Sequence, residues 1–389
     1  MTEMAPLEIA ALAPGIRSRF VQNINGLRVH LLEAGFEARG RPLVLLLHGF
    51  PELAYSWRKV MLPLAAAGFH AVAPDLRGYG RTTGWDADYD GDLASFRILN
   101  AVRDALGLVS ALGYRDVALV AGHDFGASVA AWCALVRPDV FRSLSLMSAP
   151  FAGPPSLPFD TANNSSQPAS SEVNIHDELA KLDRPRKHYQ WYYSTRPANA
   201  DMHNCPQGVH AFLRGYFHCK SADWTDNKPF RLKSWTASEL AKMPTYYIMD
   251  LHKNMAETVA ADMPSPAQIA ACRWLPDNEL AVYAGEYERA GFPRPPPQMD
   301  LAAAGVKILA HEICNHGPCR IRFRRAYTCE HLHHIRSQTA DALDLDVHRQ
   351  PSVLRVGAPD DPSRRRKLYG GLVAGIGTND EVPSLAAGR

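Results

Sequence analysis

The pattern of apolar and polar residues over the first 150 positions is typical of short strands that alternate with helices. Residues 42–47 are all apolar apart from the initial proline, as expected of a strand buried on both faces of a parallel sheet. Residues 69–75 and 142–149 predict two further strands. Helical spacing of apolar residues over 56–67 predicts a helix between the first two. Alternating strands and helices predict a mostly parallel sheet covered by helices.

A second helix is predicted from Asp92, a suitable N-cap, to Gly113, a suitable stop. One face of this helix carries its apolar residues: Leu93, Phe96, Leu99, Val102, Leu106 and Val109.

The N-terminal part of the chain predicts a hairpin. Residues 1–18 look like a frayed arm, and residues 19–35 alternate between apolar and polar around Asn25-Gly26. Asn-Gly between two alternating segments is a strong signal for a two-residue hairpin turn.

The pattern changes after Pro150. Residues 153–171 are rich in Pro, Ser and Asn, which indicates a linker, and residues 177–290 predict mostly helices with many aromatic side chains. Helices inserted at this point predict a lid over the carboxyl ends of the strands, where open α/β sheets bind ligands. We therefore divide the chain into an arm (1–18), a core (19–152), a helical lid with its linker (153–298) and a divergent C-terminal segment (299–389).

Composition narrows the class of protein. The 389 residues are 46% hydrophobic and 21% charged, as in ordinary globular enzymes, and 42 basic against 40 acidic residues argue against a nucleic-acid partner bound through bulk charge. No stretch resembles a signal peptide or the roughly 20 apolar residues of a membrane span. The seven cysteines lack a framework spacing, so we expect reduced thiols and a cytoplasmic location.

The segment that carries candidate chemistry is Gly122-His-Asp-Phe-Gly126, between an apolar run and helix-compatible residues. A strand, a sharp turn and a helix form a nucleophile elbow, in which small residues let strand and helix approach closely. Asp124 occupies the reactive position. A carboxylate nucleophile implies an ester intermediate with an alkylating substrate. The alternative is that Asp124 only caps the helix that follows it.

Four motifs in this order resemble the α/β-hydrolase superfamily and, within it, the soluble epoxide hydrolases. They are His48-Gly-Phe-Pro51, Asp75-Leu-Arg-Gly-Tyr-Gly80, Gly122-His-Asp-Phe-Gly126 and His188-Tyr-Gln-Trp-Tyr-Tyr193. The resemblance extends over residues 20–295 and implies the α/β-hydrolase fold. It also implies an epoxide as substrate, with no cofactor and no metal, and the aromatic residues of the predicted lid suggest a small apolar epoxide. The oligomeric state is not readable from the sequence.

The resemblance implies a role for four residues. Asp124 attacks an epoxide carbon, and the hydroxyl of Tyr189 protonates the epoxide oxygen. The backbone N–H groups of Phe50 and Phe125 form an oxyanion hole. Packing in an aromatic lid core is the alternative for Tyr189. For His123 and His48 we expect structural hydrogen bonds, with His48 bracing the oxyanion loop.

Three parts of the family pattern are missing. Gly291-Phe292 is not followed by the family's Asn-Trp-Tyr run, and Asp360 or Asp361 follows a strand-like run without the usual Trp-Gly. The last histidine, His348, precedes this acid instead of following it in a Gly-His-Trp setting. Either the C-terminal segment is divergent, which impairs hydrolysis of the ester, or the sequence beyond Phe292 is out of frame. We favour the second.

Other functions compete with epoxide hydrolysis. Haloalkane dehalogenases use the same elbow but bind the halide through a Trp after the nucleophile, and Phe125 has no N–H donor in its side chain. A catalytically inactive, ligand-binding member of the fold is the other alternative. His311 and His316 are five residues apart, so they do not share a helical face and do not predict a zinc site.

Overall fold

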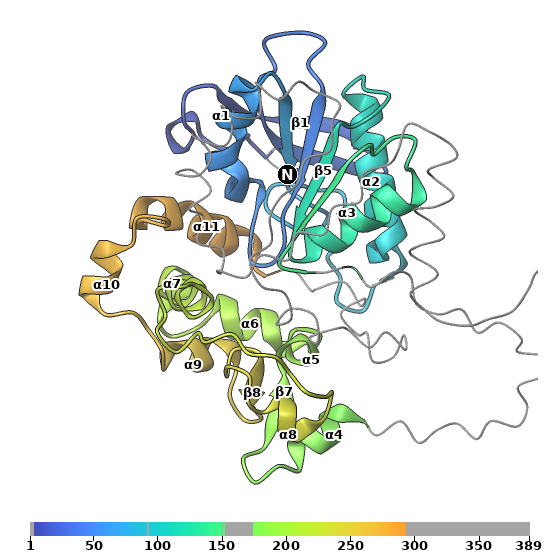
Figure 1. Ribbon diagram of the computed structural model, residues 1–389. Coiled ribbons are helices and arrows are strands. Elements are labelled where there is room, and N and C mark those ends of the chain that lie inside the picture. The colour runs from blue at the N-terminus through green and yellow to red at the C-terminus, as the bar shows by residue number, and fades with distance from the viewer. Residues whose placement is uncertain (1–3, 92, 150, 152–173, 293–389) are drawn as a thin grey trace, which may run out of the picture.

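A six-stranded sheet with the strand order β1-β2-β4-β3-β5-β6 forms the centre of the computed structural model, which describes residues 4–91, 93–149, 151 and 174–292 (Figure 1). The strands are β1 (Ile16–Ile24), β2 (Leu27–Ala34), β3 (Leu43–Leu47), β4 (His70–Pro74), β5 (Leu119–His123) and β6 (Leu144–Met147). Strands β4, β3, β5 and β6 run parallel, whereas β1 and β2 pair antiparallel. The predicted sheet, mostly parallel, is confirmed.

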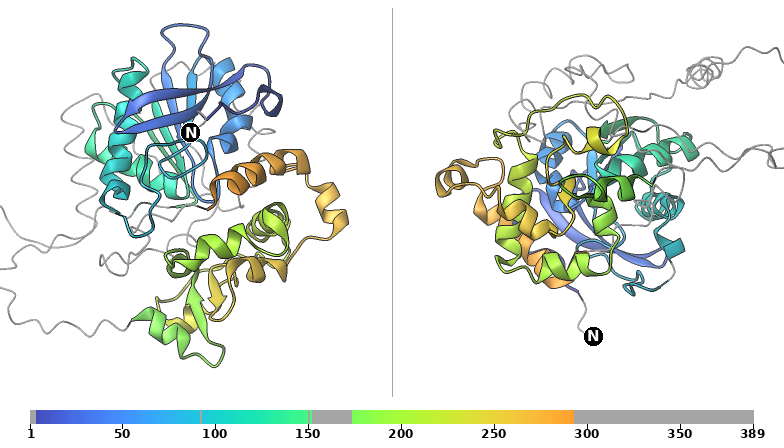
Figure 2. Two further views of the ribbon diagram at one scale, coloured as in Figure 1. Left: turned by 180° about the vertical axis from the view of Figure 1, so that it is seen from behind. Right: turned by 90° about the horizontal axis from the view of Figure 1, so that it is seen from below.

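Helices cover both faces of this sheet (Figure 2). Helix α1 (Arg58–Ala66) follows the turn η2 (Ala54–Trp57) and packs on the face that carries Leu46 and Ala71. Helices α2 (Ile98–Ala111) and α3 (Phe125–Val136) pack on the opposite face against Leu45 and Val72. The alternation of side chains along each strand therefore supplies two hydrophobic clusters, one for each layer of helices.

The N-terminal hairpin forms as predicted, with Asn25 and Gly26 at φ 49° and 81° between the paired residues Ile24 and Leu27. It begins earlier than predicted, because β1 starts at Ile16. The preceding residues include the turn η1 (Ile9–Ala11) and the buried side chains of Leu7 and Leu12. The prediction of a frayed arm up to residue 18 is therefore wrong for the described part of this segment, because that part packs on the core.

The second predicted helix begins later than expected. Its proposed cap, residue 92, lies outside the described residues, and residues Leu93–Phe96 form the separate turn η3 before α2. The backbone is extended at Arg97 (ψ 148°), so the helical period restarts there. Leu99, predicted to lie on the apolar face, is 53% exposed, and Val102, Ala105, Leu108 and Val109 form the buried face.

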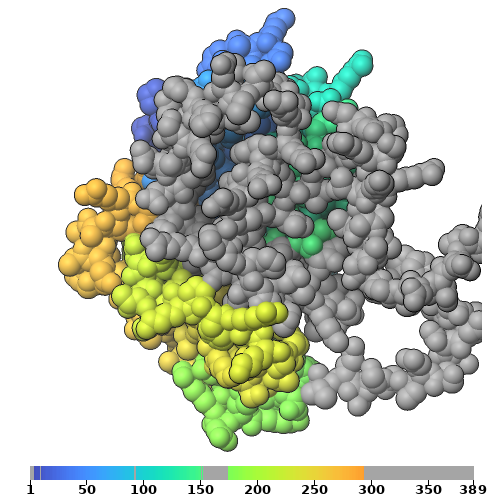
Figure 3. All heavy atoms as spheres, viewed as in Figure 1, coloured from blue at the N-terminus to red at the C-terminus, as the bar shows by residue number. Residues whose placement is uncertain are grey.

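Residues 174–292, which we call the helical segment, form a lobe next to one end of the sheet (Figures 1 and 3). Its helices are α4 (Ile175–Ala180), α5 (Tyr189–Tyr193), α6 (Pro197–His203), α7 (Gly208–Lys220), α8 (Ala237–Leu240), α9 (Met255–Ala260), α10 (Pro266–Ala271) and α11 (Asp277–Ala290). It also contains a small antiparallel sheet of β7 (Arg186–His188) and β8 (Ile248–Asp250), which the sequence pattern did not predict. No helix in the described ranges is long and apolar enough to cross a membrane.

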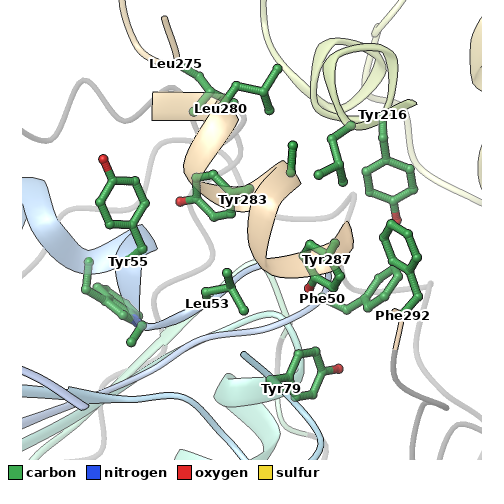
Figure 4. Close-up of a cluster of buried hydrophobic side chains, with 14 of the residues drawn as sticks. Phe50, Leu53, Tyr55, Tyr79, Tyr216, Leu275, Leu280, Tyr283, Tyr287 and Phe292 are labelled. Carbon is green, nitrogen blue, oxygen red and sulfur yellow. The ribbon is translucent and has the colours of Figure 1, made fainter. Parts of the chain in front are cut away.

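One hydrophobic cluster joins the helical segment to the core (Figure 4). Phe50, in the loop after β3, lies 6.2 Å from the Tyr216 ring of α7 and 6.3 Å from the Phe292 ring. Phe292 stacks in turn on Tyr287 of α11 at 4.5 Å. These contacts hold the helical segment against the loop that follows β3. The predicted linker 153–171 and the segment 299–389 lie outside the described residues.

Candidate active site

Asp124 lies on the turn between β5 and α3 with φ 52° and ψ −122°. A positive φ is uncommon for a residue with a side chain and stores strain. The turn is tight, because a Cβ atom at Gly122 would lie 2.0 Å from the carbonyl oxygen of Gly126, and one at Gly126 would lie 2.2 Å from that of Leu47. Both positions therefore require glycine, and the predicted strand–turn–helix elbow is confirmed.

The Asp124 side chain does not cap α3, although the residue occupies the N-cap position. Its Oδ1 atom instead accepts a hydrogen bond of 3.1 Å from the backbone N–H of Phe50. The loop after β3 lies directly against the carboxylate, since a Cβ atom at Gly49 would be 2.3 Å from the Asp124 Cβ. The structure therefore argues against the helix-cap alternative.

The two backbone N–H groups expected to form an oxyanion hole differ in their present partners. The Phe50 N–H already faces the Asp124 carboxylate. The Phe125 N–H, at the first residue of α3, donates no hydrogen bond to any residue that the structure describes. The elbow and the loop that faces it thus position both N–H groups, and the N–H of Phe125 is available for a further acceptor.

Glu52 is part of this site and was not among the residues predicted from the sequence. Its Oε2 atom accepts hydrogen bonds from the backbone N–H of Gly49 (3.1 Å) and from Nδ1 of His123 (2.7 Å). Burial alone would raise the pKa of Glu52, but the charge and hydrogen bond of His123 outweigh it and lower the pKa to about 2. Its position directly after the His48-Gly-Phe-Pro51 motif was the available signal.

His123 is the partner of Glu52 in this pair. Burial lowers its pKa, but the Glu52 carboxylate more than offsets that effect, so the pKa is raised. Its other ring nitrogen, Nε2, lies 2.9 Å from the Ser148 hydroxyl. The hydrogen-bonded, structural position expected for His123 is what the structure shows, with both ring nitrogens occupied.

His48 braces the loop after β3, as predicted. Its Nε2 atom accepts a hydrogen bond from the Leu76 N–H (3.0 Å), so the proton is on Nδ1, which donates to the Gly49 carbonyl (2.9 Å). The ring is buried, and burial lowers its pKa. His48 is therefore a neutral structural residue with no free nitrogen for proton transfer.

Asp75, in the second motif, ties the neighbouring loops together. Its carboxylate accepts hydrogen bonds from the N–H groups of Ala54 (2.8 Å) and Arg81 (3.0 Å) and pairs with Nδ1 of His30 (2.7 Å). Burial opposes ionisation, yet the His30 interaction outweighs it and lowers the pKa of Asp75 to about 2. Asp75 therefore positions the loops around the site through its hydrogen bonds.

Tyr189 is the first residue of α5, and its backbone N–H is held by the carbonyl oxygen of Tyr247 at 2.8 Å. Its ring contacts those of Tyr193 (5.6 Å) and Tyr247 (5.2 Å). Burial first, and then the negative charge of Asp124, raise the pKa of Tyr189 well above its ordinary value. The phenol is therefore protonated and within electrostatic reach of the Asp124 carboxylate.

Further polar groups of the helical segment lie around Tyr189. The Tyr193 hydroxyl donates to that of Tyr216 (3.1 Å), and the ammonium group of Lys220 lies among four tyrosine rings. No sequence pattern predicts this cluster, because its members come from three separate parts of the chain.

The candidate metal ligands and partners of the nucleophile that the sequence offers all come from the C-terminal segment. His311, His316, His348, Asp360 and Asp361 lie outside the described residues. Within the described ranges, no three His, Cys, Asp or Glu side chains are arranged to hold a metal ion. The described cysteines, Cys133, Cys205, Cys219 and Cys272, are free thiols.

Comparison with known proteins places the chain in a family. The α/β hydrolase fold family matches residues 42–231. The chain is 40% identical over 268 residues to epoxide hydrolase A of Mycobacterium tuberculosis, covering 69% of each chain. It is 44% identical over 138 residues to epoxide hydrolase 3 of Siraitia grosvenorii, a match that covers 35% of this chain and only 40% of that relative.

The solved structures that this chain resembles belong to the same family. An epoxide hydrolase from an endophytic Streptomyces matches with a TM-score of 0.56 at 25% identity, over 94% of this chain and 97% of that one. Epoxide hydrolase A from Mycobacterium thermoresistibile matches with a TM-score of 0.53 at 28% identity, over 75% and 79%. The chain belongs to the α/β-hydrolase family. Within that family it is similar to the epoxide hydrolases.

Proposed function

We propose that the protein opens an epoxide to a vicinal diol through an ester on Asp124. The observation that carries this proposal is the Asp124 carboxylate itself, held on a strained elbow by the Phe50 N–H beneath a segment rich in tyrosine. The epoxide hydrolases among its relatives support the substrate class. The aromatic lining favours a small apolar epoxide.

The Phe50 hydrogen bond distinguishes the two carboxylate oxygens. Oδ1 is held by the Phe50 N–H, so we assign the attack on the epoxide carbon to Oδ2. As the new C–O bond forms, the ring C–O bond breaks, and the epoxide oxygen takes a proton from the Tyr189 hydroxyl. The products of this step are a hydroxyalkyl ester on Asp124 and the phenolate of Tyr189.

Hydrolysis of the ester follows from the same geometry. Water adds to the Asp124 carbonyl carbon, and Oδ1 becomes the oxyanion, with the N–H groups of Phe50 and Phe125 as donors. The acyl C–O bond then breaks. One proton of the water ends on the oxygen that leaves with the diol, and the other returns to the Tyr189 phenolate, which restores the Asp124 carboxylate and the Tyr189 phenol. The helical segment, acting as a lid, limits the access of bulk water to the ester.

The base for this second step is not supplied by His48 or His123. Both ring nitrogens of each already have partners: Gly49 and Leu76 for His48, and Glu52 and Ser148 for His123. A general base needs a free nitrogen within reach of the attacking water. We therefore propose that ester hydrolysis is slower than ester formation unless residues outside the described ranges provide the base.

A mass measurement tests the proposal. The protein is incubated with an aryl epoxide, and its intact mass and the diol are measured over time, with Asp124→Asn as the control. A mass gain equal to the epoxide means ester formation without hydrolysis, and diol release means full turnover. If neither a mass gain nor diol is observed, the proposal is contradicted, and an inactive, ligand-binding member of the fold is favoured.

Haloalkane dehalogenation is the second candidate among enzymes with an Asp elbow. The side chain that follows the nucleophile, Phe125, has no N–H group for a leaving halide, which counts against it. Incubation with a haloalkane and measurement of free halide distinguishes the two reactions, and we expect no halide.

A further inference from the structure

Lys220, the last residue of α7, directs its ammonium group toward four tyrosine rings. Nζ lies 4.8 Å from the ring centre of Tyr247, 4.9 Å from Tyr216, 5.3 Å from Tyr246 and 5.6 Å from Tyr189. The rings come from α5, from α7 and from the residues just before β8. All four distances are within the roughly 6 Å at which a cation is attracted to an aromatic face.

The ammonium group has no carboxylate within ion-pair distance among the described residues. The charged and titratable groups that act on it are Tyr189, Tyr216, Tyr246, Tyr247, Cys219, Asp124, Glu52 and His123. Burial lowers the pKa of Lys220, and the negative charges of Asp124 and Glu52 oppose that effect. A lysine that served only the C-terminal dipole of α7 would not need to point into this cluster.

We propose that Lys220 stabilises the negative charge that forms on Tyr189 when the epoxide opens. The inference rests on the proposed function. In the ring-opening step an Asp124 oxygen bonds to carbon, the ring C–O bond breaks, and the proton moves from Tyr189 to the epoxide oxygen. One negative charge therefore leaves the Asp124 carboxylate and appears on the Tyr189 phenolate.

Apart from a hydrogen bond with the Gln190 side chain, the other surroundings of Tyr189 disfavour this phenolate. Burial and the neighbouring carboxylate keep the hydroxyl protonated before the reaction, and the ester removes only the second of these effects. Lys220 is the cation against the Tyr189 ring in the described part of the chain. Because it is close to both sites, its charge balances Asp124 before the step and Tyr189 after it. Lys220 thus acts through Tyr189 as a positioning residue and does not touch the substrate.

The rate of ester formation as a function of pH tests this role. The rate is measured by rapid quenching and intact mass for the wild type, Lys220→Met and Lys220→Arg. We expect Lys220→Met to be about 10- to 100-fold slower at neutral pH, as expected for the loss of one stabilising charge. The wild-type rate should fall as pH rises through the lowered pKa of Lys220, whereas the Lys220→Met rate stays flat in that range.

Two control variants complete the experiment, one with arginine at position 220 and one at a surface lysine. Lys220→Arg should keep a fast rate to higher pH, because a guanidinium remains charged. Lys253→Met, which removes a half-exposed ammonium group 3.6 Å from Asp250, should react like the wild type.

The outcomes separate this inference from the proposed function. If the wild type forms the ester and Tyr189→Phe slows it, but Lys220→Met keeps the wild-type rate and pH profile, the inference alone is wrong. It is also wrong if Lys220→Arg is as slow as Lys220→Met at neutral pH, since the side chain would then serve packing and not charge. If the wild type forms no ester, the proposed function fails, and the inference fails with it.

Discussion

The backbone N–H of Phe50 donates a hydrogen bond of 3.1 Å to Oδ1 of Asp124, which joins the loop after β3 to the elbow after β5. Strands β3 and β5 are adjacent and parallel, so their carboxyl ends bring the two loops together. The bond fixes one carboxylate oxygen and leaves the other for bonding to a substrate. Gly49 makes it possible, because no side chain separates the loop from the carboxylate.

Replacing Gly49 should therefore disable the site. A Cβ atom there would lie 2.3 Å from the Asp124 Cβ and 2.5 Å from its Oδ1, so Gly49→Ala must displace the carboxylate or the loop. We expect ester formation to slow by about 100-fold, since a displacement of this size spoils an attack geometry. Overpacking should also cost roughly 1–3 kcal/mol of unfolding free energy. Rapid-quench mass measurements and urea unfolding check the two effects.

Gly285→Ala is the matched control. Gly285 lies within α11, and a Cβ atom there would have no heavy atom within 4 Å beyond its own helix. Alanine favours helix over glycine by roughly 1 kcal/mol, so this variant should be slightly more stable and fully reactive. Equal reactivity of the Gly49 and Gly285 variants would contradict the proposed contact between the loop and the nucleophile.

Tyr189→Phe should slow ester formation and leave the fold intact. The change removes the hydroxyl that we assign as the proton donor and keeps the ring contacts with Tyr193 and Tyr247. Loss of a general acid costs about 100-fold or more in rate. Tyr192→Phe, in the same helix, loses the hydrogen bond to Asp201 and should react normally. A Tyr189→Phe variant as fast as Tyr192→Phe would leave Tyr189 with a packing role only.

Glu33 should make the stability of the core depend on pH. This carboxylate has no exposed surface and binds Arg17, Arg19 and His70. Burial opposes its ionisation, but the hydrogen bonds of His70 and Arg19 outweigh that effect and lower the pKa to about 2. Because its pKa is lowered in the folded protein, ionised Glu33 stabilises the fold at pH values above 4.5, the ordinary pKa of a glutamate. This stabilisation is lost as the pH falls from 4.5 to about 2.

The Glu33→Gln variant tests this dependence. At pH 7 it should lose roughly 2–3 kcal/mol of unfolding free energy in urea. The difference from the wild type should shrink steadily below pH 4.5, because the wild-type carboxylate itself becomes protonated. Glu37→Gln, at an exposed position, should change stability by less than about 0.5 kcal/mol at either pH. A difference for Glu33 that does not vary with pH would mean that packing and not charge is responsible.

The sheet and the elbow were readable from the sequence because local patterns determine them. Apolar runs predict the buried strands, and the glycines on either side of Asp124 occupy positions where no side chain fits. The prediction from the sequence was wrong where the backbone interrupts the helical period. Arg97 restarts the helical phase of α2, and this turns Leu99 outward despite its apolar side chain.

Parts of the candidate site depend on contacts between distant segments, which a single sequence does not reveal. Glu52 gains its role only through His123, which lies 71 positions away. From the sequence, Lys220 is an ordinary cation at the end of a helix. Only the fold brings Tyr189 of α5 and Tyr247, just before β8, to its ammonium group. A charged residue that acts through tertiary contacts cannot be recognised from periodicity or spacing in the sequence.

The described residues do not supply a base for ester hydrolysis, and we propose that another reading frame of the coding DNA beyond Phe292 encodes it. Met299 and Asp300 must be encoded by ATG followed by GAT or GAC, so a shift of one base reads tryptophan there. The next shifted codon reads isoleucine or threonine, so a Trp-Tyr pair requires a further change at this point. We expect a Gly-His-Trp motif in one of the two other frames. Its absence from both would favour a divergent C-terminal segment.

The central claim, an ester on Asp124, is tested most directly by locating the label. The wild type is mixed with an aryl epoxide, quenched in acid and digested, and the peptide that contains Asp124 is fragmented in a mass spectrometer. We predict a mass gain equal to the epoxide on Asp124, and no gain in the Asp124→Asn variant. Diol production without any label on this peptide, or a label on Glu52 in its place, would contradict the claim.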